Sequence, residues 1–447
     1  MWTVNSESGR LNAVLIQDSV ESFWEHRLPF EGIESNLQYL PRCIHPQTDG
    51  GHVEWLQLPK MLRGEGVQVF EVTEILRRGL ERASKEELRR IVKTVWGESK
   101  GPDFESLRAE HLIYGYPEKP YYDDEQERVI LPDFRRVSWP YSRDTSFTTQ
   151  LGTVICNMRR YSRRYEPSVV KLAYEMDPTL SKNIEIVWDA NGETGLSTEP
   201  SNIEGGDTQI VDEETIAIGV GQRSTITGFK RCAEELFNHD SDEKLRYICA
   251  VQLPDYPAVD YMHLDVTINY PDKGKALVMP YIWDSDLVGD MPPKKLLLKL
   301  LDSVRVQSDA HYRPMQPLLH PEGFKNAGRT TIYVNKGGKP EPLRTEKSLI
   351  DFLIREGKLE ADGLIYVSGK PEKSNDVNHL YSALMEQARG ATNVVTIKPK
   401  KVIAFKRNRR TIDELRKSGI EVKEWDDTYL DMLGGPHCST SPLSRDA

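Results

Sequence analysis

The sequence predicts an α/β protein in which one strand–helix–strand pattern recurs along the chain. Short apolar stretches alternate with amphipathic helical stretches over most of the 447 residues, and five such units can be distinguished. The units share this pattern without a letter-for-letter repeat. Length alone would allow two or three domains. Five similar units favour one repeated architecture instead, so we expect a single domain over residues 1–447.

The first three units are each recognised by apolar strands on either side of a helical stretch. The expected strand, helix and strand segments are 11–16, 52–63 and 67–70 in the first unit, and 153–156, 168–175 and 184–187 in the second. The third unit has paired strands at 208–211 and 215–218, then a helix around 229–237 and a strand at 247–251. In that helix Phe229, Cys232, Ala233, Leu236 and Phe237 recur at helical spacing.

The last two units follow the same order of elements. The fourth begins at Met262 and closes near 364–367. The fifth has a strand at 402–405 and a helix that we expect to open with the capping box Thr411-x-x-Glu414. Gly419 is placed to end this helix, before a strand at 420–422.

One segment, 74–118, departs from the pattern and predicts an inserted helical subdomain. The sequence Ser84-x-x-Glu87 within it has the form of a capping box and precedes apolar residues at helical spacing. The polar stretch 121–125 that follows predicts an exposed connector.

Composition narrows the class of protein and its partners. No apolar run approaches the roughly 18–20 residues that span a bilayer, and no secretory signal is recognised at the N-terminus. Five widely spaced cysteines without a Cys-x-x-Cys pair argue against disulfides or a zinc ribbon, so we expect a cytoplasmic protein. A net charge of −10 argues against nucleic acid as a main partner, and the basic cluster 398–410 is interpreted as solvated strand and helix ends.

The segment 262–269 combines apolar and polar residues in strict alternation, which predicts a strand with two distinct faces. On the polar face His263 and Asp265 would project side by side. That face could be catalytic, could face bulk water, or could contribute to a zinc site. No further histidine cluster lies nearby to complete a zinc site.

Five other positions carry candidate chemistry. Glu204 precedes two glycines and a strand, Asp144 follows Arg143 in a loop, and Cys438 lies in the glycine turn Gly434-Gly435-Pro436-His437-Cys438. Arg163 and Arg223 are candidates for binding a carboxylate, because the guanidinium fork makes two parallel hydrogen bonds. Each of these signals alone is also consistent with an ordinary turn, cap or surface ion pair.

Taken together and in order, these motifs resemble the arginine deiminases, which are guanidino-group-modifying enzymes. The resemblance covers nearly the whole chain and is carried by five motifs: Arg-Asp-Thr at 143–145, Ile-Glu-Gly-Gly-Asp at 203–207, Gly-x-Gly-x-Arg at 219–223, Met-His-Leu-Asp at 262–265 and Gly-Gly-x-His-Cys at 434–438. It implies a five-bladed pseudo-symmetric α/β propeller with a helical insert, which agrees with the five units and the segment 74–118.

The resemblance also implies a role for each site residue. Cys438 would be the nucleophile, His263 the general acid and base, and Glu204 its partner. Asp144 and Asp265 would bind the guanidinium, and Arg163 and Arg223 the α-carboxylate of a small-molecule guanidino substrate. No metal or organic cofactor would be needed, and self-association is left open. The expected reaction converts L-arginine and water to L-citrulline and ammonia through a covalent thiouronium intermediate.

Three alternatives remain at this point. An amidinotransferase would use the same intermediate but pass the amidino group to an amine. A deiminase of a modified arginine is suggested by Ser138 and Leu433, which stand where family members carry an asparagine and, in some cases, an arginine. Agmatine lacks a carboxylate, so the retained Arg163 and Arg223 argue against it. The third alternative is a binding protein without catalysis, which the presence of Cys438, His263 and Glu204 disfavours.

Overall fold

The computed structural model describes a set of segments that includes both chain ends. The described residues are 1–17, 54–96, 101–114, 116, 121–124, 127–130, 141–160, 163–193, 201–254, 261–283, 296–297, 299–300, 325–372, 376–427 and 434–447. In this part of the chain no helix has the length and apolar character needed to cross a membrane.

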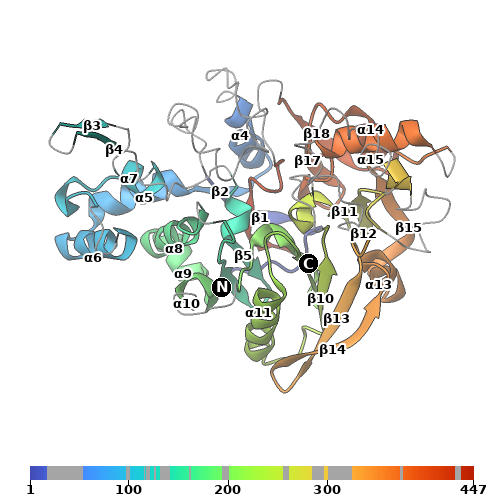
Figure 1. The fold of residues 1–447 in the computed structure, drawn as a ribbon, viewed down its shortest axis with the longest axis horizontal. Helices are drawn as coiled ribbons and strands as arrows, with labels where there is room; N and C mark the ends of the chain where they lie inside the picture. Colours follow the sequence, from blue (N-terminus) through green and yellow to red (C-terminus); the bar gives the residue numbers. More distant parts are fainter. Residues whose placement is uncertain are drawn as a thin grey trace.

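The described chain forms a mixed α/β fold in which one sheet topology recurs five times (Figure 1). Each time, an antiparallel pair of strands is followed by a helix and then by a strand that pairs parallel with the middle one. The antiparallel partner, middle strand and parallel partner of the first two sheets are β19 (Ser441–Arg445), β1 (Leu11–Ile16) and β2 (Gln68–Glu71), and β5 (Ser146–Thr149), β6 (Gly152–Ile155) and β7 (Ile186–Asp189).

The other three sheets repeat this arrangement. Their strands are β8 (Thr208–Asp212), β9 (Thr215–Val220) and β10 (Tyr247–Gln252); β11 (Ile268–Asp272), β12 (Gly274–Val278) and β15 (Leu359–Tyr366); and β16 (Val395–Lys398), β17 (Lys401–Phe405) and β18 (Glu421–Trp425). The hairpin of β13 (Thr330–Lys336) and β14 (Lys339–Glu346) extends the sheet of β10 to five strands.

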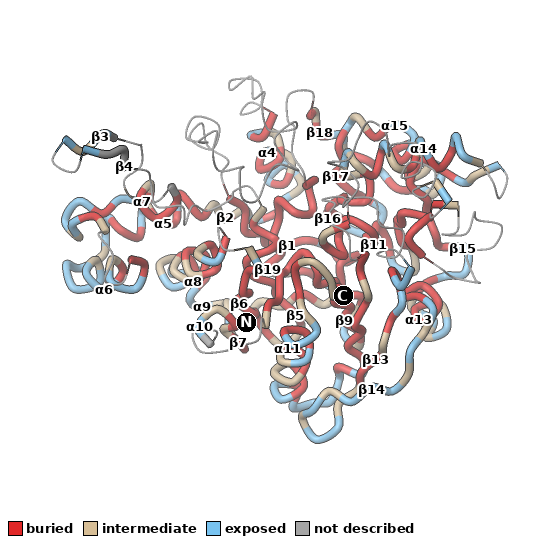
Figure 2. Tube along the Cα trace, in the orientation of Figure 1, coloured by how far each residue is buried: buried red, intermediate tan, exposed pale blue. Residues whose placement is uncertain are grey.

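The connecting helices fall into two groups. Helices α4 (Gln57–Gly64), α8 (Glu166–Met176), α11 (Ile226–His239) and α15 (Arg409–Lys417) overlap predicted helices. Helices α9 (Pro178–Asn183), α13 (Leu349–Arg355) and α14 (Val377–Gln387) had no predicted counterpart, and neither had the short α10 (Ala190–Glu193), which follows β7. The predicted start of the first helix, His52, lies outside the described residues. Buried residues concentrate along the sheets, whereas the outer helix faces and β14 are largely exposed (Figure 2).

Helices α5 (Val72–Arg82), α6 (Lys85–Trp96) and α7 (Ala109–Tyr114) occupy most of the segment predicted to be helical and lie on one side of the molecule (Figure 1). The capping box before α6 is confirmed: the Glu87 amide donates to Ser84 Oγ at 3.2 Å, and the Ser84 amide donates to Glu87 Oε2 at 2.8 Å. The expected connector at 121–125 is wrong in part, because β3 (Tyr121–Asp123) and β4 (Arg128–Ile130) pair as an antiparallel hairpin.

The second predicted capping box is also wrong. Helix α15 starts at Arg409, so Thr411 lies inside its first turn. The Thr411 hydroxyl instead donates to the carboxylate of Glu386 in α14 at 2.6 Å, which satisfies it through a tertiary contact. Gly419 lies just beyond this helix with φ of +79°, as expected for a glycine that ends a helix.

The two ends of the chain meet in the first sheet, where β19 pairs antiparallel with β1. Glu7, in the segment before β1, is buried and lies 2.9 Å from Arg143 Nη1, 3.5 Å from His437 Nε2 and 3.9 Å from Arg445 Nε. Burial raises the pKa of Glu7, but Arg143, His437 and Arg445 outweigh burial and hold that pKa far below its ordinary value. The carboxylate therefore compensates cations contributed by segments far apart in the sequence.

Replacement of Glu7 by glutamine should destabilise the fold by about 3–5 kcal/mol, because it leaves the buried Arg143 without its carboxylate partner. Urea denaturation at neutral pH measures this loss. Since folding lowers the pKa of Glu7, the stabilisation is present above the ordinary pKa of 4.5 and is lost as the pH falls through the folded pKa. The matched control is Glu105→Gln, whose pair with Lys85 is exposed, with an expected cost of under about 1 kcal/mol. Equal effects of the two changes would contradict this assignment.

Candidate active site

The candidate site residues come from one recurring place in the fold, the short segment that precedes the first strand of a sheet. The 3₁₀ turn η2 (Ser142–Thr145) precedes β5, η5 (Gly205–Asp207) precedes β8, and η7 (Leu264–Val266) precedes β11. The loop of residues 434–440, called the Cys438 loop below, precedes β19 in the same way. Turn η5 contacts both η2 and η7, so side chains from different sheets meet.

His263 and Asp265 are buried in the site, but the predicted strand at 262–269 is wrong. His263 is the N-cap of η7, and β11 begins only at Ile268. The chain turns here because the Leu264 amide donates to the Asp207 carboxylate at 3.2 Å and the Thr267 hydroxyl donates to the Leu264 carbonyl at 2.8 Å. His263 is 2% exposed and Asp265 is fully buried, which excludes the alternative of a polar face in bulk water.

His263 lies between two carboxylates. Its Nε2 is 2.8 Å from Glu204 Oε2, and its Nδ1 is 3.6 Å from Asp144 Oδ1. Burial lowers the pKa of His263, but Asp144, Asp207 and Glu204 outweigh burial and raise that pKa to about 9. The ring is therefore an imidazolium at neutral pH. Burial raises the pKa of Glu204, whereas Arg223 and His263 bring it well below its ordinary value, so Glu204 is ionised.

Asp144 is held by Arg163, which donates from Nη1 to Asp144 Oδ2 at 2.6 Å. The same guanidinium also bonds the buried carboxylate of Glu166, with Nη2 to Oε2 at 2.8 Å. Burial lowers the pKa of Arg163, but Glu166 and Asp144 outweigh it and raise that pKa well above its ordinary value. Arg163 thus fixes one oxygen of Asp144 in place. The expectation that Arg163 binds a substrate carboxylate would require it to loosen these bonds.

Arg223 is close to the same cluster from the loop before α11. Its Nη1 lies 3.6 Å from Glu204 Oε2, and its Nη2 donates to the sulfur of Met262 at 3.1 Å. The guanidinium is buried. Arg163 and Arg223 therefore each face one of the two carboxylates that flank His263.

Cys438 is 4% exposed and lies among polar groups that have opposite effects on its ionisation. Its thiol donates to Asp265 Oδ2 at 3.2 Å and accepts a hydrogen bond from Asn393 Nδ2 at 3.0 Å. Burial raises the pKa of the Cys438 thiol well above its ordinary value, and Asp265 and Asp144 raise it further, whereas the Asn393 hydrogen bond lowers it. The site as described thus holds a neutral thiol together with a protonated His263.

Asp265 forms hydrogen bonds with both Cys438 and its sequence neighbour His437, for which no role was predicted from the sequence. His437 Nδ1 lies 2.8 Å from Asp265 Oδ2, the same oxygen that accepts from the thiol. Burial raises the pKa of Asp265, but His437 outweighs burial and lowers it, so Asp265 is ionised. An ionised carboxylate only accepts hydrogen bonds, so His437 Nδ1 carries a proton.

Arg143, for which the sequence suggested a surface ion pair with Asp144, is buried and donates hydrogen bonds to the Cys438 loop instead. Its backbone amide donates to the Cys438 carbonyl at 3.1 Å, and its Nε donates to the Thr440 carbonyl at 2.8 Å. Its charge is paired with Glu7 rather than with Asp144. The loop that carries Cys438 is therefore fixed on both sides of the cysteine.

The two glycines after Glu204 are required by close packing in the site. A Cβ atom on Gly205 would lie 2.1 Å from the Arg143 carbonyl oxygen. A Cβ atom on Gly206 would lie 2.5 Å from Asp144 Oδ1 and 2.8 Å from His263 Nδ1. The Glu-Gly-Gly-Asp motif is thus a place where three segments approach one another closely.

Two carboxylate oxygens in the site are left with unused acceptor capacity. Asp144 Oδ1 and Asp265 Oδ1 are buried and have no hydrogen-bond partner among the described residues. The other oxygen of each carboxylate is engaged, by Arg163 and by His437 with Cys438 respectively. Buried acceptors without partners are costly, so these two oxygens suit a ligand that brings N–H donors.

The charge pattern fits acid–base chemistry better than a metal site. Ligand atoms of Asp144, Glu204 and His263 lie within 4.8 Å of one another, as a divalent cation would need. The pKa of His263 is raised to about 9, so a cation bound here would first have to displace the ring proton. Arg163 and Arg223 already supply positive charge to the two carboxylates.

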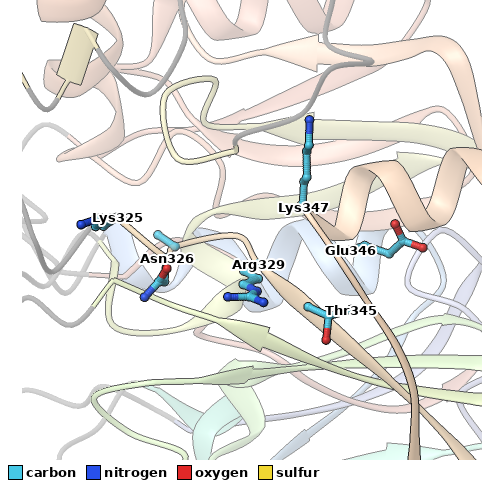
Figure 3. Close-up of a pocket in the computed structure, with 7 residues that line it drawn as sticks. Lys325, Asn326, Arg329, Thr345, Glu346 and Lys347 are labelled. Carbon is cyan, nitrogen blue, oxygen red and sulfur yellow. The ribbon is translucent and has the colours of Figure 1, made fainter.

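Ser138 and Leu433, the two departures from the family pattern, fall outside the described residues. A separate cavity of about 310 Å³ lies beside the β13–β14 hairpin, with Arg329 and Thr345 among its lining residues (Figure 3). None of the candidate site residues lines it.

Comparison with known proteins identifies the family of the chain. The family model described as arginine deiminase matches residues 124–295 and 376–445, which together exceed half of the chain and include all seven predicted site residues.

Curated relatives named arginine deiminase show low but extended identity. The protein of Mycoplasma capricolum subsp. capricolum is 26% identical over 333 residues, which covers 74% of this chain and just under two thirds of the relative (65%). The protein of Listeria monocytogenes serotype 4a is 25% identical over 418 residues, covering 87% of this chain and 85% of the relative. Among solved structures, an amidinotransferase from Microseira wollei in the saxitoxin biosynthetic pathway shares the fold, with a TM-score of 0.52, 12% identity and coverage of 100% and 98%. The chain belongs to the arginine deiminase family.

Proposed function

We propose that this protein hydrolyses the guanidinium group of L-arginine to give L-citrulline and ammonia. The observation that carries the proposal is the pair of buried oxygens, Asp144 Oδ1 and Asp265 Oδ1, in a site that also holds a thiol and an imidazolium. A guanidinium is a planar cation with five N–H donors, which matches two carboxylate acceptors in charge and in hydrogen bonding. The names of the curated relatives support arginine as the substrate.

Binding of this cation prepares the nucleophile. The thiol of Cys438 stays protonated while the charges of Asp265 and Asp144 act on it. A guanidinium held by those two carboxylates offsets their charge, so the thiol releases its proton to solvent when substrate is present. Holding the guanidinium carbon at attack distance from sulfur can contribute up to about 7–11 kcal/mol of the barrier reduction.

The first half-reaction forms a covalent intermediate. The Cys438 thiolate attacks the guanidinium carbon to give a neutral tetrahedral adduct. His263, already protonated, donates its proton to the departing nitrogen, the C–N bond breaks and ammonia leaves. A cationic S-alkylthiouronium remains on the sulfur. General acid catalysis of this kind contributes about 10²–10⁴-fold in rate.

The second half-reaction reverses the role of His263. The ring, now neutral, takes a proton from water as the oxygen attacks the thiouronium carbon. The C–S bond then breaks, its electron pair returns to Cys438 as thiolate, and the ureido product gives its extra proton to that thiolate, which restores the neutral thiol before the product leaves. Glu204, at 2.8 Å from Nε2, orients the ring and favours its protonated form in each cycle.

The fold proposed for this chemistry is a single domain over 1–447, a five-bladed α/β propeller with a helical insert at 74–118. The five recurrences of one sheet topology support it, as does the supply of site residues from equivalent segments. Arg223, with Arg163 if it loosens from Glu166, would bind the α-carboxylate.

The substrate assignment is tested by incubating purified protein with L-arginine and measuring citrulline and ammonia. Cys438→Ala should abolish turnover, and His263→Ala should lower kcat by about 10²–10⁴-fold because the general acid is lost. Cys249→Ala removes a buried thiol in β10, remote from the site chemistry, and serves as the matched control with activity retained. Robust citrulline formation by Cys438→Ala would refute the mechanism.

The same assay separates hydrolysis from amidino transfer. Added glycine or another primary amine should leave the citrulline yield unchanged and acquire no amidino group. Transfer to the amine, detected by mass spectrometry, would assign the chain to amidinotransferase chemistry, which the Microseira wollei protein carries out on the same fold. A panel of modified arginines and agmatine then identifies the preferred guanidine.

The state of the thiol predicts a pH dependence for the substrate-free enzyme. Since burial, Asp265 and Asp144 raise the Cys438 pKa well above 9.0, its alkylation by iodoacetamide should be slow at neutral pH and should still increase at pH values above 9.0. Asp265→Asn removes a charge that raises this pKa, so the rise in alkylation rate should move to lower pH. Asp272→Asn, at another buried aspartate in β11, is the control and should follow the wild type. A wild-type rate that levels off at neutral pH would contradict the assigned thiol state.

A further inference from the structure

Asn393 occupies, in the fifth sheet, the place that carries the site residues in the others. It lies in the segment immediately before β16, as Asp144 lies before β5, Glu204 before β8 and Cys438 before β19. The side chain is fully buried. No sequence motif pointed to a function for Asn393.

Both the oxygen and the nitrogen of the Asn393 carboxamide contact the Cys438 loop. Its Oδ1 accepts from the Gly435 amide at 2.8 Å and from the Cys438 amide at 3.0 Å. Its Nδ2 donates to Cys438 Sγ at 3.0 Å and to the Asp265 carbonyl at 3.2 Å. Since Oδ1 binds two amides, the orientation that directs the NH₂ group at the sulfur is fixed by chemistry and not by choice of rotamer.

We propose that Asn393 is a catalytic residue that stabilises the thiolate of Cys438 in both half-reactions, which rests on the proposed role of Cys438 as nucleophile. An amide N–H donates more strongly to an anionic sulfur than to a neutral thiol. The bond therefore strengthens when the thiol ionises before attack. It strengthens again when the C–S bond breaks and sulfur takes back the electron pair.

This role answers an electrostatic need of the site. The carboxylates that bind the guanidinium, Asp144 and Asp265, both oppose ionisation of the neighbouring thiol. An amide donor offsets part of that effect without adding a positive charge that would repel a cationic substrate. A lysine or arginine at this position would favour the thiolate but compete with the guanidinium for the same two carboxylates.

A purely structural role is the competing explanation, because Oδ1 also fixes the loop. Asn393→Asp separates the two: the variant has the same shape and keeps an acceptor for the Gly435 and Cys438 amides, but it replaces the donor to sulfur by a charged oxygen. Asn393→Ser is the second variant, with a side chain too short to span the loop amides and the sulfur together. Asn335→Asp is the matched control, since Asn335 in β13 likewise accepts from a main-chain amide and donates to a main-chain carbonyl.

The measurement is the rate of iodoacetamide alkylation at Cys438, located by peptide mass spectrometry, at one mildly alkaline pH below the thiol pKa. A hydrogen bond to a charged group is worth one to two pKa units, so both Asn393 variants should alkylate about 10–100-fold more slowly than wild type. Asn335→Asp should match wild type. Circular dichroism and urea denaturation identify the variants that are folded.

Folded Asn393→Asp or Asn393→Ser protein that alkylates at the wild-type rate would overturn the proposal. Parallel arginine assays should show kcat reduced more than KM raised, because the donor acts on the reacting sulfur. Alkylation needs no substrate turnover. Suppose that wild-type protein forms no citrulline, but the Asn393 variants alkylate more slowly than wild type. This result would count against the arginine reaction while supporting Asn393 as the donor to sulfur.

Discussion

The arrangement of the site depends on one carboxylate oxygen, Asp265 Oδ2, which accepts from both His437 and Cys438. This sharing fixes the carboxylate, leaves its other oxygen without a hydrogen-bond partner among the described residues and raises the pKa of the thiol. Buried charges need compensation by neighbours, and the compensation here extends outward. His437 lies 3.5 Å from Glu7, and Glu7 pairs with Arg143, whose backbone amide bonds the carbonyl of Cys438.

The repeated topology explains how such distant residues meet. Each sheet begins with a strand preceded by a short turn, and those turns supply Asp144, Glu204, His263 with Asp265, Asn393 and Cys438. The pairing of β19 with β1 brings the last of these turns back to the beginning of the chain. The repeated position thus brings an imidazole, a carboxamide, a thiol and three carboxylates together, and glycines at 205 and 206 allow the turns to approach within contact distance.

Much of this could be predicted from the sequence, where local patterns decide local structure. The apolar runs of β1, β9, β10 and β17 became strands, and the exposed Ser84 and Glu87, three residues apart, formed their capping box. Tertiary contacts decided the failures. Asp207 captures the Leu264 amide and turns a predicted strand into η7, and Glu386 captures Thr411. Asn393 and Glu7 belong to no sequence motif. Only the contacts in the structure, from Asn393 to Cys438 and from Glu7 to Arg143, connect them to the site.

The covalent intermediate on Cys438 is the central claim, and acid-quenched mass spectrometry tests it most directly. Enzyme mixed with L-arginine and quenched during turnover should carry, on the peptide containing Cys438, an added mass equal to arginine less ammonia. In His263→Ala the adduct should accumulate if its hydrolysis is the slower step, and should not form if its formation is the slower step. Cys438→Ala should carry no adduct. Turnover to citrulline with no adduct on Cys438 at any quench time, or an adduct on a different residue, would contradict the account.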